Sequence, residues 1–182
     1  MNFGTWKIRT LSDNTDSEHP ERRTAIIARE LRRFNIDIAA LQETQRAGKE
    51  QLKEEKGGYT FFWKGLSEQE HQIHGAGFPI KNDLVKLLSE VPTGINERLS
   101  TLRIKLTQNQ QATIISAYAP TLDANEDIKE KFYSQLDTVL SETPKEDKII
   151  LLDYVIVRAK DRHDVLLTRV MTSLTTAGQI TD

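Results

Sequence analysis

A chain of 182 residues with 37% hydrophobic and 29% charged residues is long enough for one globular domain with its own core. It has no cysteine, which excludes disulfides and thiolate metal sites, and its net charge of −2 gives no overall attraction to nucleic acid, so such a site needs a local patch or a bound cation. The N-terminus lacks the apolar core of a signal peptide and no run could span a membrane, so we expect no membrane association and favour an intracellular location, nuclear or cytoplasmic.

The N-terminal part predicts a strand, a helix and a second strand. Residues Phe3–Leu11 alternate, with Trp6 and Ile8 on one face, which is typical of a half-buried strand. A helix is predicted from Pro20 to Asn35. Its apolar face consists of Ile27, Leu31 and Phe34. Its outer face carries Arg22, Arg23, Arg29, Arg32 and Arg33, which indicate a solvated basic surface more often than a phosphate contact.

The next strand ends in an acid. Residues Ile36–Leu41 form a short apolar run, which favours a buried strand over a helix and completes a β-α-β opening. Gln42 and Glu43 follow at the point where this strand reaches the surface. Two interpretations are open here: Glu43 is an acid that ends a strand in water, or it is a functional acid at the rim of a sheet.

The middle of the chain predicts strands separated by polar segments. We expect a surface loop or a short helix over Arg46–Lys56, a break at Gly57 and Gly58, and a strand over Tyr59–Trp63. Gly75–Ile80 predicts another strand, at an edge or a bulge because it contains Pro79. His71 and His74 have a spacing that can bind a metal on a helix, but no acid pattern supports such a site. Leu84–Leu88 fits either a helical turn or a strand.

The C-terminal half predicts a hairpin, a helix and two strands. The hairpin covers Leu99–Tyr118 and turns at Asn109 and Gln110. Asn125 is the N-cap of a helix that ends near Glu142. The apolar face of this helix consists of Ile128, Phe132, Leu136, Val139 and Leu140. Strands are then predicted over Lys148–Val157 and Val165–Met171, followed by a disordered tail over Ser173–Asp182.

Three motifs, in this order, resemble those of the exonuclease–endonuclease–phosphatase family and in particular its retrotransposon endonuclease branch. They are Gly4-Thr5-Trp6, Leu41-Gln42-Glu43-Thr44 and Ser116-Ala117-Tyr118-Ala119-Pro120-Thr121. The resemblance implies an α/β fold in which a two-layer β-sandwich is flanked by helices, the DNase I-like fold, here incomplete. It divides the chain into a partial domain over residues 1–172 and a tail over 173–182.

The resemblance also implies chemistry. Members of this family cut phosphodiesters with Mg²⁺ or Mn²⁺, because an anionic substrate repels hydroxide unless a hard cation offsets the charge of the transition state. On these matches Glu43 is the metal ligand, and Tyr118 is the tyrosine that approaches the phosphate. Asp153 is the late aspartate that pairs with a catalytic histidine, although its strand could also place it at the position of the acid/base aspartate.

The sequence departs from the family pattern in three places. Lys7 stands where the family has the asparagine that helps to place the metal, and an ammonium group should repel a divalent cation. The expected Gly-Asp-Phe-Asn segment is missing, since Leu152 and Val155 stand where its Gly and Asn would be. The chain also lacks the closing Ser-Asp-His, and His163 matches no motif.

These departures set the functional expectation. Residues that act together in catalysis fail together, so we expect a DNA phosphodiesterase domain that is weak or inactive, with Mg²⁺ or Mn²⁺ weakly bound if at all. The alternative is a non-catalytic remnant that binds nucleic acid or protein. A missing segment should also leave strand edges uncovered, which would favour self-association.

Overall fold

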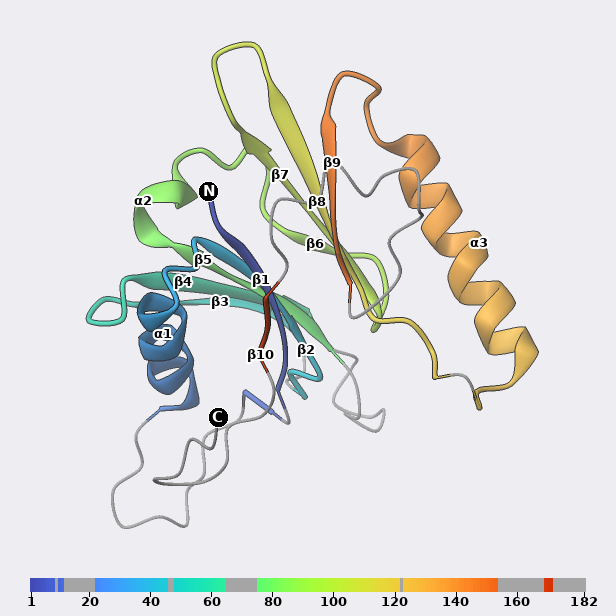
Figure 1. Cartoon of the computed structure of the whole chain (residues 1–182), viewed down its shortest axis with the longest axis horizontal. Coiled ribbons are helices and arrows are strands. Elements are labelled where there is room, and N and C mark those ends of the chain that lie inside the picture. Colours follow the sequence, from blue (N-terminus) through green and yellow to red (C-terminus); the bar gives the residue numbers. More distant parts are fainter. Residues whose placement is uncertain are drawn as a thin grey trace.

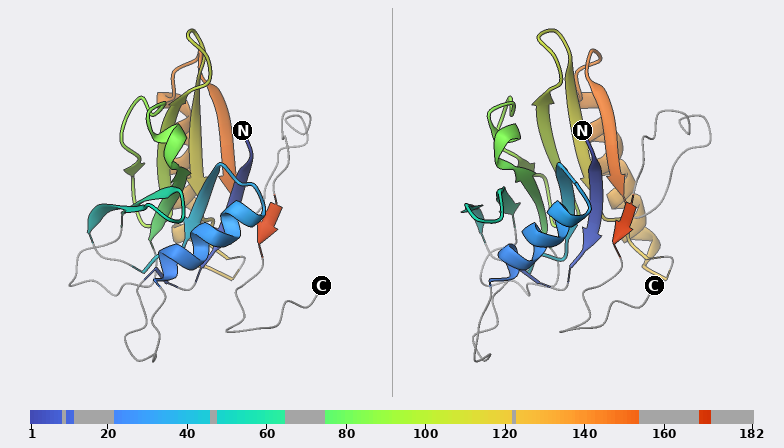
Figure 2. Two further views of the ribbon diagram at one scale, coloured as in Figure 1. Left: turned by 90° about the vertical axis from the view of Figure 1, so that its left-hand side faces the viewer. Right: turned by 60° about the vertical axis from the view of Figure 1, so that its left-hand side comes forward.

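Two β-sheets pack face to face, and one long helix lies on the outer side of each sheet (Figure 1, Figure 2). The computed structural model describes residues 1–8, 10–11, 22–45, 48–64, 75–121, 123–153 and 169–171. The arrangement is the two-layer sandwich with flanking helices that the sequence predicted. Within the described residues, no helix is both long and apolar enough to cross a membrane.

The larger sheet has the strand order β10-β1-β2-β5-β4-β3. Its strands are β1 (Phe3–Lys7), β2 (Ile38–Gln42), β3 (Lys49–Glu54), β4 (Tyr59–Lys64), β5 (Ala76–Lys81) and β10 (Arg169–Met171). Strand β1 is parallel to both β2 and β10, and the remaining pairs are antiparallel. The parallel β1–β2 pair is the predicted β-α-β opening.

The smaller sheet has the order β6-β7-β8-β9. Its strands are β6 (Thr93–Gly94), β7 (Leu99–Lys105), β8 (Gln111–Ala117) and β9 (Lys148–Asp153). Strands β7 and β8 form the predicted hairpin, and β9 lies parallel to β8. A short helix, α2 (Asn82–Val85), follows β5, so the ambiguous segment Leu84–Leu88 begins as a helical turn and ends in a β-bridge between Leu88 and Ile104.

The side chains of β2 hold two layers together because they alternate between the two faces of the larger sheet. Ile38 and Ala40 belong to the cluster between the two sheets, together with Phe78 and Ile114. Ala39 and Leu41 point the other way, into a second cluster under the helix α1. Every residue of β2 is therefore buried, which is why this strand has an almost continuous apolar sequence.

Helix α1 (Arg23–Arg33) covers the outer face of the larger sheet through Ile27, Ala28 and Leu31. The position of Pro20, where the sequence predicted its start, lies outside the described residues. Arg32 fixes the helix to the β3–β4 turn, because its guanidinium donates hydrogen bonds to the carbonyl oxygens of Lys56 and Gly57 at 3.1 and 2.8 Å.

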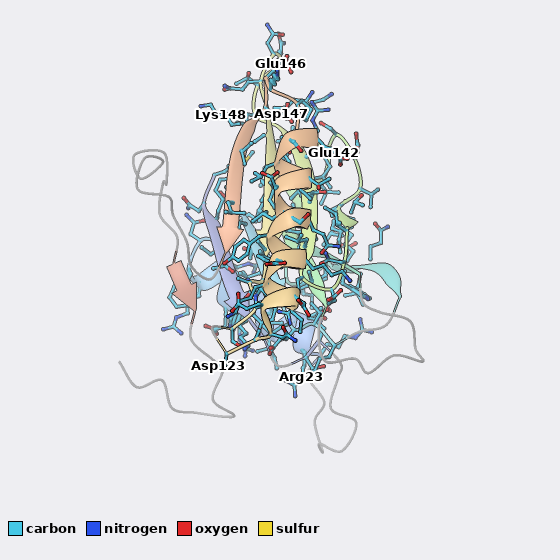
Figure 3. All side chains as sticks on the ribbon, turned by 90° about the vertical axis from the view of Figure 1, so that its right-hand side faces the viewer. Arg23, Asp123, Glu142, Glu146, Asp147 and Lys148 are labelled. Atoms are coloured by element: carbon cyan, nitrogen blue, oxygen red, sulfur yellow. The ribbon has the colours of Figure 1, made fainter. Side chains whose placement is uncertain are left out.

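Helix α3 (Glu126–Glu142) lies along the outer face of the smaller sheet (Figure 3). Asn125 is its N-cap, as predicted, and the Asn125 side chain accepts a hydrogen bond from the backbone N–H of Asp127. Phe132 and Val139 are buried, whereas Ile128 is exposed, so the predicted apolar face is correct except at the first turn. At the far end of this sheet, Arg103 binds the Asp147 carboxylate with two hydrogen bonds of 2.7 and 2.9 Å, and β9 begins directly afterwards.

Two predictions of local structure were wrong. The charged segment predicted as a loop or helix contains the strand β3, which pairs with β4 along its whole length at the edge of the sheet, where charged side chains remain in water. Strand β5, predicted at an edge or a bulge because of Pro79, lies between β2 and β4 in an unshifted register. The ladder between β2 and β5 pairs Ile38 with Ile80 and Leu41 with Gly77, with no pair at Pro79, which has no N–H to donate.

Candidate functional site

The predicted site lies at one end of the sandwich. Three strands, β1, β2 and β8, each bring a polar side chain to this end. Strand β1 ends at Lys7, β2 leads into Glu43, and β8 leads into Tyr118. Strand β9 ends at Asp153, whose Cα is paired with that of Ala117. The parallel pairing of β1 with β2 and of β8 with β9 explains the convergence, because parallel neighbours finish at the same edge of a sheet.

Glu43 is held in an unusual backbone conformation. Its φ angle of 60° lies in the left-handed region, which side chains with a Cβ rarely adopt. The residue before it, Gln42, is still inside the sandwich, so the chain turns sharply where the strand ends. The Glu43 side chain is 19% exposed and reaches toward the other sheet.

Lys7, Glu43 and Tyr118 form a closed triangle of contacts between the two sheets. The Lys7 ammonium donates to the Tyr118 hydroxyl at 3.0 Å, and its Nζ lies 3.1 Å from Glu43 Oε1. The Tyr118 hydroxyl donates to the same Oε1 at 2.8 Å. One carboxylate oxygen thus accepts from both partners.

The contacts of Lys7 favour its charged form. The hydrogen bond to Tyr118 is the largest cause that raises the pKa of Lys7, partial burial opposes it, and the hydrogen bond to Glu43 adds to the rise. The Lys7 side chain is 46% exposed, so its ammonium is both bound within the protein and open to solvent.

A second cation approaches the same tyrosine. The Arg98 guanidinium carbon and the Lys7 Nζ each lie 5.3 Å from the centroid of the Tyr118 ring, within cation–π distance. Arg98 also donates a hydrogen bond of 3.3 Å to the Tyr118 carbonyl oxygen. The end of the sandwich therefore holds two positive side chains around one aromatic ring.

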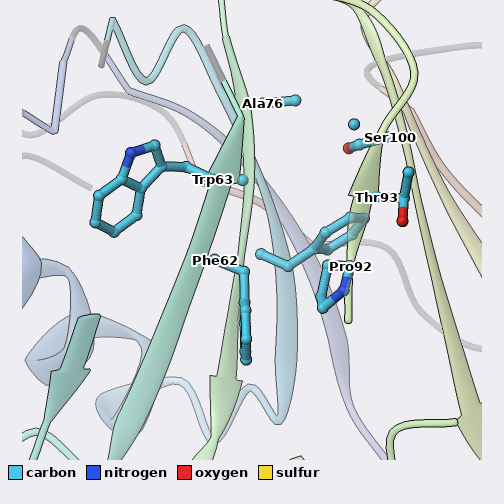
Figure 4. A pocket seen from close by; sticks show the side chains of 9 residues that line it. Phe62, Trp63, Ala76, Pro92, Thr93 and Ser100 are labelled. Atoms are coloured by element: carbon cyan, nitrogen blue, oxygen red, sulfur yellow. The ribbon is translucent and has the colours of Figure 1, made fainter. Parts of the chain in front are cut away.

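A polar seam lies below this site, inside the sandwich. The Gln42 amide donates to Thr5 Oγ1 at 3.3 Å and to the Ala117 carbonyl oxygen at 3.5 Å, which links the two sheets. Gln42 Oε1 and the hydroxyls of Ser100 and Ser116 are buried without a hydrogen-bond partner among the described residues. Ser100 also lines a small recess, with Phe62, Pro92 and Thr93, that has room for about one water molecule (Figure 4).

The structure brings together two of the three predicted site residues, Glu43 and Tyr118. The third, Asp153, terminates a strand at the same end of the sandwich. Sequence reasoning missed Arg98, which precedes β7 and belongs to none of the matching motifs. The histidines considered above, His71, His74 and His163, lie outside the described residues.

The described side chains around Glu43 do not form a set of ligands for a divalent metal ion. In the part of the chain that the structure describes, no group of three or more His, Cys, Asp or Glu side chains could hold a metal ion. Mg²⁺ requires near-octahedral oxygen ligands, and here Lys7 places an ammonium group on the carboxylate that would bind it. Instead, the carboxylate is paired with the Lys7 ammonium and lies near a second positive side chain, that of Arg98.

Comparison with known proteins gives the same fold. No family model matches the sequence. Craniofacial development protein 2 of Bos taurus is 26% identical over 150 residues, which cover 82% of this chain and 23% of that protein. The chain thus spans about a quarter of the length of this curated relative.

A solved structure of TDP2 from D. rerio has a related architecture. Its complex with a single-strand DNA product matches with a TM-score of 0.50 at 12% identity, covering 88% of this chain and 62% of that chain. A humanized D. rerio TDP2 with 14 mutations matches with a TM-score of 0.47 at 12% identity, covering 81% of this chain and 64% of that chain. The likeness to the TDP2 complex shows the DNase I-like fold that the motifs led us to expect.

Proposed function

We propose that this chain is a retrotransposon-derived, DNase I-like domain that no longer hydrolyses phosphodiesters and that binds DNA at the end of the sandwich where Lys7, Glu43 and Tyr118 meet. The contact between Lys7 Nζ and Glu43 Oε1 at 3.1 Å carries this proposal. Metal-dependent hydrolysis needs a cation that polarises the phosphate and activates water. An ammonium group bound to the carboxylate supplies positive charge to the phosphate but does not coordinate and activate a water molecule.

The positive charge around Tyr118 supports DNA as the ligand. Lys7 and Arg98 are the kinds of side chain that bind phosphate, whose contacts supply most of the sequence-independent affinity for nucleic acid. D. rerio TDP2, which has the same type of fold, was crystallised with a single-strand DNA product. A nucleic-acid ligand also fits the intracellular location that the sequence favours.

A plasmid-nicking assay tests the loss of hydrolysis. Supercoiled plasmid is incubated with the protein in Mg²⁺ or Mn²⁺, and the Glu43→Ala variant provides the background. We expect the parent protein to nick no more than Glu43→Ala, because the carboxylate does not hold a productive cation. Metal-dependent nicking by the parent that disappears in Glu43→Ala would show that the domain is an active nuclease.

Fluorescence anisotropy of a labelled single-stranded oligonucleotide tests binding. We expect Lys7→Gln to weaken binding and to reduce its salt dependence by about one phosphate contact. The matched control is Lys105→Gln, since Lys105 is exposed at the end of β7 that is distant from Arg98 and Tyr118. Absence of binding at about 100 µM protein in low salt, by a protein that melts cooperatively, would favour the protein-binding alternative instead.

A further inference from the structure

We propose that the Lys7 ammonium is a built-in cation that takes the place of a divalent metal on Glu43, so that the site contacts a phosphodiester without a metal ion. This inference rests on the proposed function for the identity of the ligand, but its claim about the cation is separate. It identifies one residue that decides whether the site is occupied by lysine or by metal.

The geometry places the two cations in competition for one carboxylate oxygen. Mg²⁺ binds carboxylate oxygen at about 2.1 Å, and Lys7 Nζ already lies 3.1 Å from Glu43 Oε1. A metal on that oxygen would therefore stand no more than about 5 Å from the ammonium, where like charges repel strongly. The same oxygen also accepts a hydrogen bond from the Tyr118 hydroxyl, so two donors already contact it.

The ammonium has capacity left for a ligand. Lysine carries three N–H donors, and the contacts with Tyr118 and Glu43 use two of them. Nearly half of the side chain is exposed, so a phosphate oxygen can reach it from solvent. Arg98 adds positive charge on the same ring, while Glu43 offsets only one charge. The site is therefore suited to an anion even without a metal.

Removal of the lysine should open the carboxylate to metal. In Lys7→Asn, an amide oxygen replaces the ammonium beside Glu43, which exchanges a repelling charge for a neutral oxygen ligand. Lys7→Gln is a second variant with a longer amide side chain. Both substitutions remove an exposed side chain that no core cluster contains, so the fold should tolerate them. The double variant Lys7→Asn/Glu43→Gln removes the carboxylate as well and is the control.

Titration with Mn²⁺ alone, followed by the electron paramagnetic resonance signal of the free ion, measures the binding directly. We expect the parent chain to bind at least tenfold more weakly than Lys7→Asn, and the gain to be lost in Lys7→Asn/Glu43→Gln. Saturable binding by the parent that Glu43→Gln removes would overturn the inference. Failure of both Lys7→Asn and Lys7→Gln to gain affinity, while each still melts cooperatively, would overturn it as well.

The second measurement uses the labelled single-stranded oligonucleotide at constant ionic strength, in EDTA and in Mn²⁺. The parent should bind equally in both, whereas Lys7→Asn should bind more weakly in EDTA and recover in Mn²⁺. If Lys7→Asn binds the oligonucleotide equally well in EDTA and in Mn²⁺, the inference is contradicted. If the parent does not bind DNA at all, the proposed function fails, and the Mn²⁺ titration still decides whether Lys7 excludes the metal.

Discussion

Tyr59 shows how one buried hydroxyl connects two elements. Its ring belongs to the cluster under α1, it is 1% exposed, and its hydroxyl donates to the carbonyl oxygen of Ile36, at the entrance to β2. Burial raises the pKa of Tyr59 to about 12, and the nearby Asp37 carboxylate adds to the rise. The folded state therefore favours the neutral phenol.

This contact predicts a pH-dependent effect of Tyr59→Phe. Near pH 8 we expect a loss of about 1–2 kcal/mol in the free energy of unfolding, because the Ile36 carbonyl loses its donor. A raised pKa means that the contribution is complete below the unfolded pKa of about 10 and is lost as the pH rises toward about 12. Urea denaturation measures the difference in free energy of unfolding between parent and variant. This difference should be smaller at about pH 11 than at about pH 8, and an unchanged difference would contradict the assignment.

The individual site residues differ in how far the sequence could reveal them. Glu43 and Tyr118 each follow a strand that its apolar pattern predicts, so their convergence could be expected once the strands were paired. Arg98 could not be found in this way, because its contact with Tyr118 joins positions in a loop and at a strand end whose approach only the tertiary fold determines. The sequence showed Lys7 as a departure from a motif, but it did not predict the ion pair between Lys7 and Glu43.

Among the elements, the hairpin β3–β4 and the helix α1 fit together at one glycine. A Cβ added at Gly57 would lie 2.6 Å from the Cβ of Ala28 and 3.1 Å from that of Glu54. Arg32 binds the carbonyl oxygen of the same glycine. This close approach is what allows α1 to cover the hairpin end of the sheet.

Gly57→Ala should therefore destabilise the domain by about 1–3 kcal/mol, because helix and hairpin must move apart. Ala28→Gly in the same chain removes the opposing methyl group. We expect the double variant to lose less stability than the sum of the two single variants, as measured by urea denaturation in a double-mutant cycle. Strict additivity would mean that the two positions do not meet in solution.

Strand β9 is the element whose surroundings raise the question of self-association. No described strand pairs with its outer edge, and on its outward face Ile149 and Leu151 are 48% and 37% exposed. Strand edges with apolar side chains and no inward charge pair readily with other chains. We expect the parent protein to form concentration-dependent oligomers and Leu151→Lys to shift them toward monomer, as measured by light scattering after gel filtration. A parent that stays monomeric at all concentrations would show that this edge is protected.

At the level of elements, the sequence was sufficient where burial on one or both faces leaves a periodic pattern. The fully buried β2, the hairpin β7–β8 and the capped helix α3 were predicted on this basis. It failed for β3, whose charged residues are typical of a helix or loop and become a strand only because β4 offers an edge. It failed for the place of β5 because a gap in the ladder with β2, at Phe78 and Pro79, proved tolerable inside the sheet.

The whole molecule is a stack of four layers, from α1 through the two sheets to α3. Because β2 and β4 contribute side chains to the cluster under α1 and to the cluster between the sheets, the layers share strands rather than only touching. Shared strands should make unfolding a single event.

This arrangement predicts that two probes report one transition. Trp6 and Trp63 both lie in the cluster under α1, so tryptophan fluorescence follows that layer, whereas far-ultraviolet circular dichroism also follows α3 on the other side. Thermal melts recorded by the two probes should coincide. Separate transitions would show that the layers unfold independently, and no transition at all would rule out a defined domain and with it every assignment at Glu43.

The contact between Lys7 and Glu43 also has a genetic consequence. Lysine and asparagine codons differ only at the third base, so one transversion would exchange the ammonium for an amide. If Lys7 excludes a metal ion as proposed, the domain remains a single base change from a carboxylate that is open to metal. Exclusion of the metal at this position would therefore be reversible by ordinary mutation.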